Sequence, residues 1–343
     1  MTSNETEPRL ISTPVKTATA GVSYAGLTSK VDANSLTSSG KRRPSVLSAI
    51  KTLIYQSLLF AVALLPTPLA YRLACIIGQT RYRRRGDASR RLARAMQSRL
   101  SVSSRESEEW TRRYFELEAW DEVETWHCRR AGRSKIRQLL EFEGIENLDQ
   151  ALAAGKGAVL CAAHFRGLFI LMMALAERGY KLNAIRRKPL GRQNRIGRWF
   201  NDQTTLIRHG ACNFLWMEPD NLKVAIHAGA ALRRNEVVLV LIDGRFAAQS
   251  VDVTFMGQTV AIPFGPMVIA RTTGSPLLNL SLRLDHHGQF RHFARIGPPF
   301  YPSADVAASV QHCMSELEGA IVQDPANWIW FEDRIVWNGH ERS

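Results

Sequence analysis

The chain has 343 residues, of which 45% are hydrophobic and 22% are charged. This length and composition exclude a fibrous protein and favour a globular one, with one large domain or two smaller ones. The net charge of +14 and the isoelectric point of about 10.0 indicate a partner of opposite charge. Nucleic acid, an anionic lipid surface and an acidic protein all fit that description, and charge alone does not choose among them.

The cysteines argue against an oxidised or metal-stabilised protein. They are five in number, scattered along the chain and free of CxxC spacing. This usage is unlike a disulfide framework or a zinc site, and it is typical of the cytoplasmic side of a membrane. The histidines show no metal-ligand spacing either. We therefore expect no metal and no other cofactor.

The first part of the chain divides into a polar tail and an apolar segment. Residues 1–45 are rich in serine and threonine and poor in aromatic residues, so we predict a disordered tail. Residues 53–80 form the most apolar stretch, but Pro66 and Pro68 interrupt it and Arg72 follows. Both a single transmembrane helix and a helix lying in the bilayer interface fit this pattern.

A basic segment follows directly, because residues 81–100 hold eight arginines against one aspartate. Arginines beside an apolar anchor suit the anionic cytoplasmic leaflet of a membrane. A solvated helix face is the plainer alternative, and a nucleic-acid patch is the third, without any accompanying nucleic-acid motif. We assign residues 46–100 to a membrane-associated segment with a basic helix, and residues 101–343 to a separate α/β domain.

The second half of the chain alternates between strand and helix patterns. Aromatic and aliphatic residues three or four positions apart predict a helix within 104–140. Short apolar runs at 157–164, 181–187 and 236–244 are typical of strands buried on both faces. Helical patterns at 168–179 and 221–235 separate those strands. This alternation predicts an α/β fold with a mostly parallel sheet flanked by helices.

Three polar residues close the predicted parallel strands. His164, Arg187 and Asp243 each stand at the end of an apolar run. Ligands gather at the carboxyl ends of parallel strands, so we expect these residues near one another. The stretches 275–285 and 290–300 predict two antiparallel strands, and a last helix is expected over about 304–322.

A histidine at a strand end can act as a general base on a hydroxyl, since its pKa near 6.5 leaves it mostly neutral at cytoplasmic pH. Nearby arginines can bind phosphate or stabilise an oxyanion. A lone histidine is more often a structural residue, so the position of His164 does not by itself establish catalysis.

Several sequence blocks carry a family resemblance. They are GKGAVLCAAHF, RRKP, LIRHG, VVLVLIDGR, FMGQTVAIPFGPMVIARTTGSPLL and PANWIWFEDR, in that order between about residues 50 and 335. In order and spacing they resemble the lipid A late acyltransferases, the lauroyl and myristoyl transferases of the lysophospholipid acyltransferase superfamily. The resemblance implies a glycerolipid-acyltransferase-like α/β fold, with an apolar membrane-associated helical segment before it.

The resemblance also implies a catalytic pair, written H-x4-D/E. In the family the histidine deprotonates the acceptor hydroxyl, which attacks the thioester of an acyl carrier protein, while the acid orients the imidazole. His164 matches the histidine, but the acid's position is occupied by Phe169. Three explanations stay open. Asp243 supplies the acid, with Asp202 and Glu218 as further candidates; or histidine acts without an acid; or the chain keeps a lipid-binding fold and has lost the chemistry.

Further positions carry over as substrate-binding residues. Arg187, or its neighbour Arg186, and Arg208 match family arginines suited to phosphate, and exposed strand-end charge is their plainer explanation. Gly244 belongs to the family's acidic turn, and Phe169 is a candidate wall of the acyl channel. FMGQ (255–258) and PFGP (263–266) resemble a family loop that leads into a helix.

The leading hypothesis is an acyltransferase at the cytoplasmic face of the inner membrane. It would move a fatty acyl group from acyl carrier protein or acyl-CoA to a hydroxyl or amine of a glycolipid or other lipid. A non-catalytic lipid-binding relative is the alternative, and the two differ in whether a carboxylate reaches His164. Binding of nucleic acid is not expected, because neither a helix-turn-helix nor an aromatic and basic binding face is evident.

Overall fold

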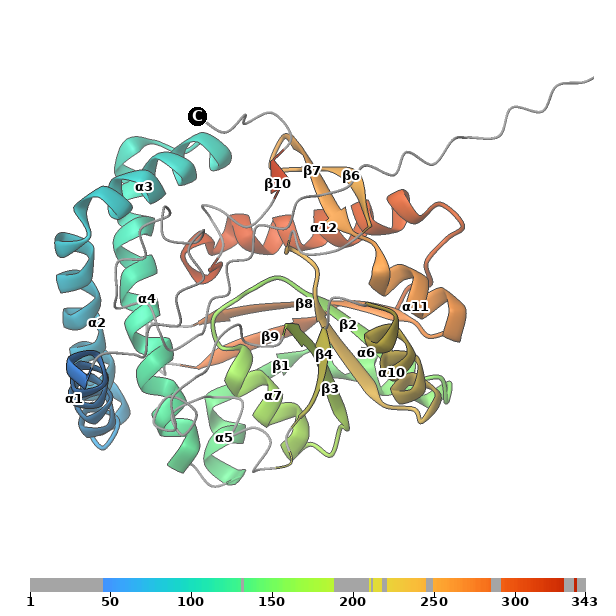
Figure 1. The fold of residues 1–343 in the computed structure, drawn as a ribbon, viewed down its shortest axis with the longest axis horizontal. Helices are drawn as coiled ribbons and strands as arrows, with labels where there is room; N and C mark the ends of the chain where they lie inside the picture. The colour runs from blue at the N-terminus through green and yellow to red at the C-terminus, as the bar shows by residue number, and fades with distance from the viewer. Residues whose placement is uncertain are drawn as a thin grey trace, which may run out of the picture.

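A computed structural model of the chain describes residues 46–130, 133–187, 210, 212–217, 221–244, 249–284, 291–329 and 336–337 (Figure 1). The predicted tail at 1–45 lies outside these residues. The expected fold is observed in its main features, a mixed α/β domain whose mostly parallel sheet is flanked by helices.

Four helices precede the sheet. They are α1 (Val46–Val62), α2 (Thr67–Arg84), α3 (Gly86–Leu100) and α4 (Ser104–Arg130). The predicted apolar segment is thus two helices, because Pro66 precedes α2 and Pro68 lies in its first turn, where no intrahelical N–H is needed. Among the described residues, no helix combines the length and the apolar character that crossing a membrane requires.

Helix α4 joins this N-terminal layer to the rest of the molecule (Figure 1). The ring of Tyr71 on α2 meets Trp120 on α4 edge to face, with centroids 5.3 Å apart. Gly78 allows the two backbones to approach closely, since a Cβ there would lie 2.4 Å from the carbonyl oxygen of Phe115. Arg81 of α2 adds an ion pair with Glu122 of α4 at 2.7 Å. The two helices therefore pack as one unit.

The main sheet has seven strands in the order β1-β9-β8-β2-β5-β3-β4. All neighbouring pairs are parallel except β8 and β9, which run antiparallel as predicted. The predicted strands at 157–164, 181–187 and 236–244 are confirmed, whereas β1 and β4 were not anticipated. The strand bounds are β1 (Leu140–Glu143), β2 (Ala158–Ala162), β3 (Leu182–Arg187), β4 (Asn213–Met217), β5 (Val237–Leu241), β8 (Leu277–Leu284) and β9 (His292–Ile296).

Helices cover both faces of the sheet, with α12 and α7 on opposite sides (Figure 1). The buried aliphatic residues of β2, β5 and β8 form the centre of the core between them. The helix predicted within 104–140 is observed as α4 and α5, with residues 131–132 between them outside the described residues, and the other predicted helices are confirmed within a few residues. The remaining helices are α5 (Arg133–Leu139), α6 (Ile145–Ala153), α7 (Leu168–Glu177), α10 (Asn221–Arg233), α11 (Gly265–Thr273), α12 (Val306–Gln323) and a short 3-10 turn, η2 (Pro325–Asn327).

The segment expected as a loop before α11 is a hairpin instead. Strands β6 (Ser250–Phe255) and β7 (Gln258–Pro263) pair antiparallel, and β10 (Val336–Trp337) extends them to a small second sheet. Met256 and Gly257 connect β6 to β7 with φ of 50° and 69°. Two left-handed residues make the tight turn that matches the twist of a hairpin. The expected helix does begin at Gly265, with Pro266 in its first turn.

Candidate active site

His164 stands just beyond the carboxyl end of β2. The strand is buried along its whole length, which reflects its short, uninterrupted apolar sequence. The chain then turns through residues 163–167, the His164 loop, before α7 begins at Leu168. The His164 side chain is 16% exposed, so part of the ring is accessible from outside the core.

Asp243 meets His164 from the neighbouring strand. Strands β2 and β5 are parallel with Ala162 opposite Leu241, so both polar residues lie two positions past this last pair. The imidazole Nδ1 lies 2.6 Å from Asp243 Oδ1, and the backbone N–H of His164 donates to Oδ2 at 2.8 Å. The predicted convergence of these two strand ends is thus observed.

Asp243 is fully buried and still favours its ionised form. Burial opposes ionisation, but the imidazole and backbone N–H of His164 and the indole of Trp328 outweigh it and hold the pKa of Asp243 below its ordinary value. An ionised carboxylate only accepts hydrogen bonds, so Nδ1 of His164 carries the proton. In the neutral imidazole, Nε2 then carries the lone pair that can accept a proton.

The third donor to Asp243 comes from the segment 325–329, which we call the strap. Trp328 Nε1 donates to Asp243 Oδ2 at 2.7 Å, and the whole side chain is buried. The strap also runs beside the His164 loop, where Ile329 N–H donates to the carbonyl of His164 at 2.9 Å and Arg166 N–H donates to that of Asn327 at 2.9 Å. The sequence block PANWIWFEDR was noted for its resemblance, but no contact with Asp243 was anticipated.

Helix α4 supports the other side of the loop. Asp121 accepts a hydrogen bond from the N–H of Gly167 at 3.1 Å. Gly167 has φ of 84°, and a Cβ there would lie 2.5 Å from Nδ1 of His292. His292 is buried and lies 2.7 Å from a carboxylate oxygen of Glu124. Burial works against its charged form, yet Glu124 and Asp121 raise the pKa of His292 above its ordinary value.

Of the predicted substrate-binding residues, the structure describes Arg187, Gly244 and Phe169 but not Arg208. Arg187 ends β3, which neighbours β5 on the side away from β2, so one strand separates it from β2. Arg186 is half-buried, with its guanidinium 5.8 Å from the ring centroid of Phe214. Gly244 follows Asp243 directly and is half-buried. Arg208 lies outside the described residues, as do Asp202 and Glu218.

Phe169 lies in the first turn of α7 and is 8% exposed. It belongs to the hydrophobic core formed by β2, α7 and their neighbours. The position that the resemblance assigns to an acid is therefore an apolar one here. Its role as a wall of an acyl channel stays a prediction.

Metal-binding side chains do not cluster in the part of the chain that the structure describes. No group of three histidine, cysteine, aspartate or glutamate side chains has the arrangement that a metal ion requires there.

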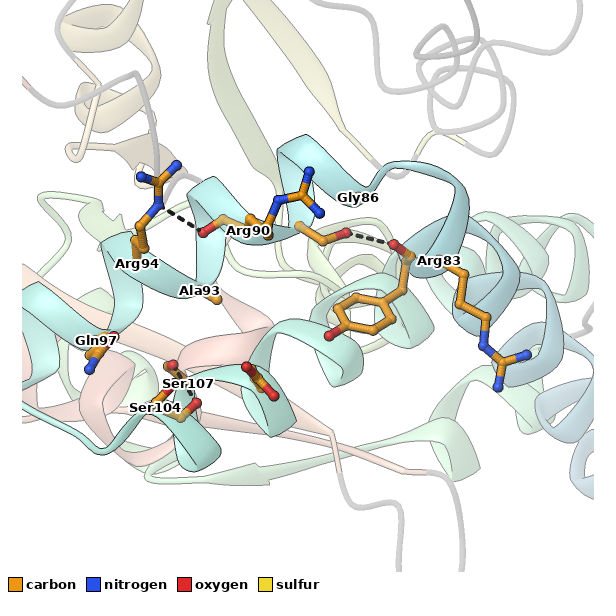
Figure 2. A pocket seen from close by; sticks show the side chains of 11 residues that line it. Arg83, Gly86, Arg90, Ala93, Arg94, Gln97, Ser104 and Ser107 are labelled. Atoms are coloured by element: carbon orange, nitrogen blue, oxygen red, sulfur yellow. Dashed lines mark hydrogen bonds between the residues drawn. The ribbon is translucent and has the colours of Figure 1, made fainter.

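A groove opens elsewhere, between α3 and the start of α4 (Figure 2). It has a volume of about 540 Å³, and its lining includes Arg83, Arg90 and Arg94 together with Ser104 and Ser107. His164 and Asp243 do not line it, so it is separate from the candidate active site.

Helices α1 and α2 also present exposed apolar side chains on their outer side. Ile54 is the most exposed of them at 65%. Exposed groups of this kind are typical of surfaces that bind lipid or protein. The large apolar residues exposed along α1, α2 and the turn between them are Ile50, Leu53, Ile54, Leu58, Phe60, Leu64, Leu69 and Ile76.

The sequence of the chain is similar to those of known acyltransferases. The family model described as bacterial lipid A biosynthesis acyltransferase matches residues 38–336. Curated relatives are the phosphatidylinositol mannoside acyltransferases of Mycobacterium tuberculosis strains CDC 1551 / Oshkosh and ATCC 25618 / H37Rv. Each is 29% identical over 192 residues, which are 54% of this chain and 56% of the relative. The chain thus matches about half the length of these relatives.

Proposed function

Because the chain belongs to the bacterial lipid A biosynthesis acyltransferase family, we propose that it moves a fatty acyl group from a thioester donor to a lipid acceptor. The proposed donor is acyl carrier protein or acyl-CoA. The proposed acceptor group is a hydroxyl or amine of a glycolipid or another lipid, and His164 is the proposed general base.

The contact between His164 and Asp243 is the observation that carries this proposal. Phe169 removes the acid that the H-x4-D/E pattern would supply, which raised the possibility of a non-catalytic relative. Asp243 instead brings a buried carboxylate within 2.6 Å of Nδ1, which is the arrangement expected of an acid that orients a catalytic imidazole.

The proposed reaction needs only these groups and its two substrates. Nε2 of His164 accepts the proton of the acceptor hydroxyl as the oxygen attacks the thioester carbonyl carbon. A carbon–oxygen bond forms and a tetrahedral oxyanion results. The oxyanion then collapses, the carbon–sulfur bond breaks, and the leaving thiolate takes the proton from the imidazolium. Asp243 stabilises that imidazolium in the interval and holds the ring in place.

The relatives favour a glycolipid acceptor, because their name specifies acylation of a phosphatidylinositol mannoside. We propose that the site works at a membrane, on the cytoplasmic face of the inner membrane. The exposed apolar residues of α1 and α2 support this location, since their burial in lipid is favourable. The arginines of α2 and α3 would lie against anionic headgroups or an acidic carrier.

The test is transfer of a radiolabelled acyl group from acyl carrier protein, and in parallel from coenzyme A, to a lipid extract. We expect His164→Ala to lower the transfer rate by at least about a hundredfold, the usual contribution of a general base. Asp243→Asn should lower it by about a hundredfold or more, because the imidazole loses its orienting charge. The matched control is His227→Ala, which changes an exposed histidine on α10 and should leave the rate unchanged.

The alternative hypothesis makes a different prediction for the same assay. A lipid-binding relative without catalysis would show no transfer from either donor, although it would still bind the lipid extract. Transfer that persists in His164→Ala would instead show that another residue is the base, and the role proposed for His164 would then be wrong.

A further inference from the structure

The carboxylate of Asp243 accepts two hydrogen bonds in addition to its contact with the imidazole of His164. One oxygen, Oδ1, faces Nδ1 of His164 at 2.6 Å. The other, Oδ2, accepts two hydrogen bonds, from the backbone N–H of His164 at 2.8 Å and from Nε1 of Trp328 at 2.7 Å. With both donors on Oδ2, the carboxylate has one orientation in which Oδ1 points at the imidazole.

Trp328 is itself buried and held by its neighbours. Its ring meets Phe255 of β6 edge to face, with centroids 5.7 Å apart. The strap that carries it pairs with Phe165 of the His164 loop in an antiparallel bridge. Tyr114 of α4 donates from its hydroxyl to the carbonyl of Ile329 at 3.0 Å. The indole N–H therefore has little freedom to leave Asp243.

We infer that Trp328 is a positioning residue for acyl transfer, which fixes the carboxylate of Asp243 so that it orients His164. This inference rests on the function proposed above, and it adds a third member to the pair. An indole N–H can only donate a hydrogen bond, so it favours the ionised carboxylate at Oδ2 and leaves Oδ1 for the imidazole. Without it, Asp243 can rotate or take a proton on Oδ2, and the imidazole loses a fixed partner.

The test compares Trp328→Phe with a second buried tryptophan. Trp328→Phe keeps an aromatic ring and removes the N–H donor. We expect kcat to fall by about tenfold or more, the usual value of a hydrogen bond to a charged group. The KM for the acyl donor should change by less than about twofold, since no substrate contact is lost. The control is Trp120→Phe, because Trp120 is also buried but its Nε1 makes no hydrogen bond to the described residues.

A double substitution separates positioning from general support of the fold. If Trp328 acts through Asp243, then adding Trp328→Phe to Asp243→Ala should lower kcat by less than about twofold. An undiminished tenfold loss in that background would overturn the inference, because no carboxylate is left to hold. Full activity of Trp328→Phe, together with loss of activity in His164→Ala, would also overturn the inference. The proposed function would be supported in that case, and only the role of Trp328 would be wrong.

A second measurement does not depend on whether Trp328→Phe folds or on activity. In the unchanged protein labelled with ¹⁵N, one of the eight indole N–H signals should lie downfield and exchange slowly with solvent. Asp243→Asn should shift that signal upfield, because the charged acceptor becomes neutral. If no indole signal responds to Asp243→Asn, the inference is wrong. If His164→Ala keeps full transfer activity, both the proposed function and this inference fall.

Discussion

At the scale of single residues, Phe169 occupies the position at which the H-x4-D/E pattern expects an acid, and another residue supplies that acid. The side chain of Phe169 lies in the hydrophobic core at the start of α7. The carboxylate that faces His164 comes instead from Asp243, two positions beyond the end of β5. Restoring the family's residue at 169 would therefore place a charge in an apolar environment.

We predict that Phe169→Glu lowers the free energy of unfolding by at least about 3 kcal/mol at pH 7.5, since it removes apolar burial and buries a carboxylate. Phe169→Leu, the size control, should cost about 1 kcal/mol. Burial would raise the pKa of the new glutamate above its unfolded value of about 4.3, so the penalty should shrink as the pH falls toward that value. Urea unfolding at pH 7.5 and pH 5 measures both effects. Equal stability of the two variants would mean that residue 169 reaches water or a cation.

Gly167 and Gly179 form a matched pair at the two ends of α7. Both have positive φ, of 84° and 93°, but a Cβ at Gly167 would collide with His292 whereas one at Gly179 would meet nothing within 4 Å. We predict that Gly179→Ala lowers the free energy of unfolding by about 1 kcal/mol and keeps activity. Gly167→Ala should cost more and reduce acyl transfer, because it displaces the His164 loop. Thermal unfolding and the transfer assay together test this, and equal behaviour of the two variants would contradict it.

At the scale of elements, α1 and α2 give the most direct test of membrane association. We predict that the full chain binds vesicles containing phosphatidylglycerol, and that Ile54→Glu with Leu58→Glu weakens binding by at least about tenfold, since each side chain contributes apolar area. Ile226→Glu is the control, because Ile226 is exposed to 54% but lies on α10. Co-sedimentation measures the binding. An equal effect of the control, or no binding by the unchanged chain, would place the lipid contact elsewhere.

Arginines and apolar residues should differ in their response to lipid charge and salt. Arg91→Glu with Arg94→Glu is expected to weaken binding to anionic vesicles at low salt and to have little effect at high salt, where surface charges are screened. The apolar variants should weaken binding at either salt concentration. This difference distinguishes the two contributions within one assay.

At the scale of the whole molecule, the sequence predicted which strands end in polar residues but not how the strands are ordered. The apolar runs before His164, Arg187 and Asp243 were sufficient to identify β2, β3 and β5. Their order, β2-β5-β3, decides that Asp243 lies directly beside His164 while Arg187 lies one strand further away. Strand order depends on packing between distant segments, which local patterns do not record.

Two features could not be predicted from the sequence, each for a specific physical reason. The hairpin of β6 and β7 turns at Met256, a residue type that rarely adopts positive φ, so the turn carried only Gly257 as a signal. Trp328 contacts Asp243 across 85 positions of sequence. A buried indole that hydrogen-bonds a distant carboxylate has the same local pattern as any core tryptophan.

The strap also determines when the site can form while the chain is being synthesised. The ribosome completes the His164 loop about 160 residues before it reaches residues 325–329, an interval of roughly 10 to 30 s at the usual rate of translation. During that interval the carbonyl of His164 and the N–H of Arg166 lack their backbone partners, and Asp243 lacks its indole donor. Tyr114 likewise waits for a partner 215 positions downstream. The His164 loop thus gains these partners only after the strap has been synthesised, so a nascent chain that stalls before residue 325 carries an unfinished site.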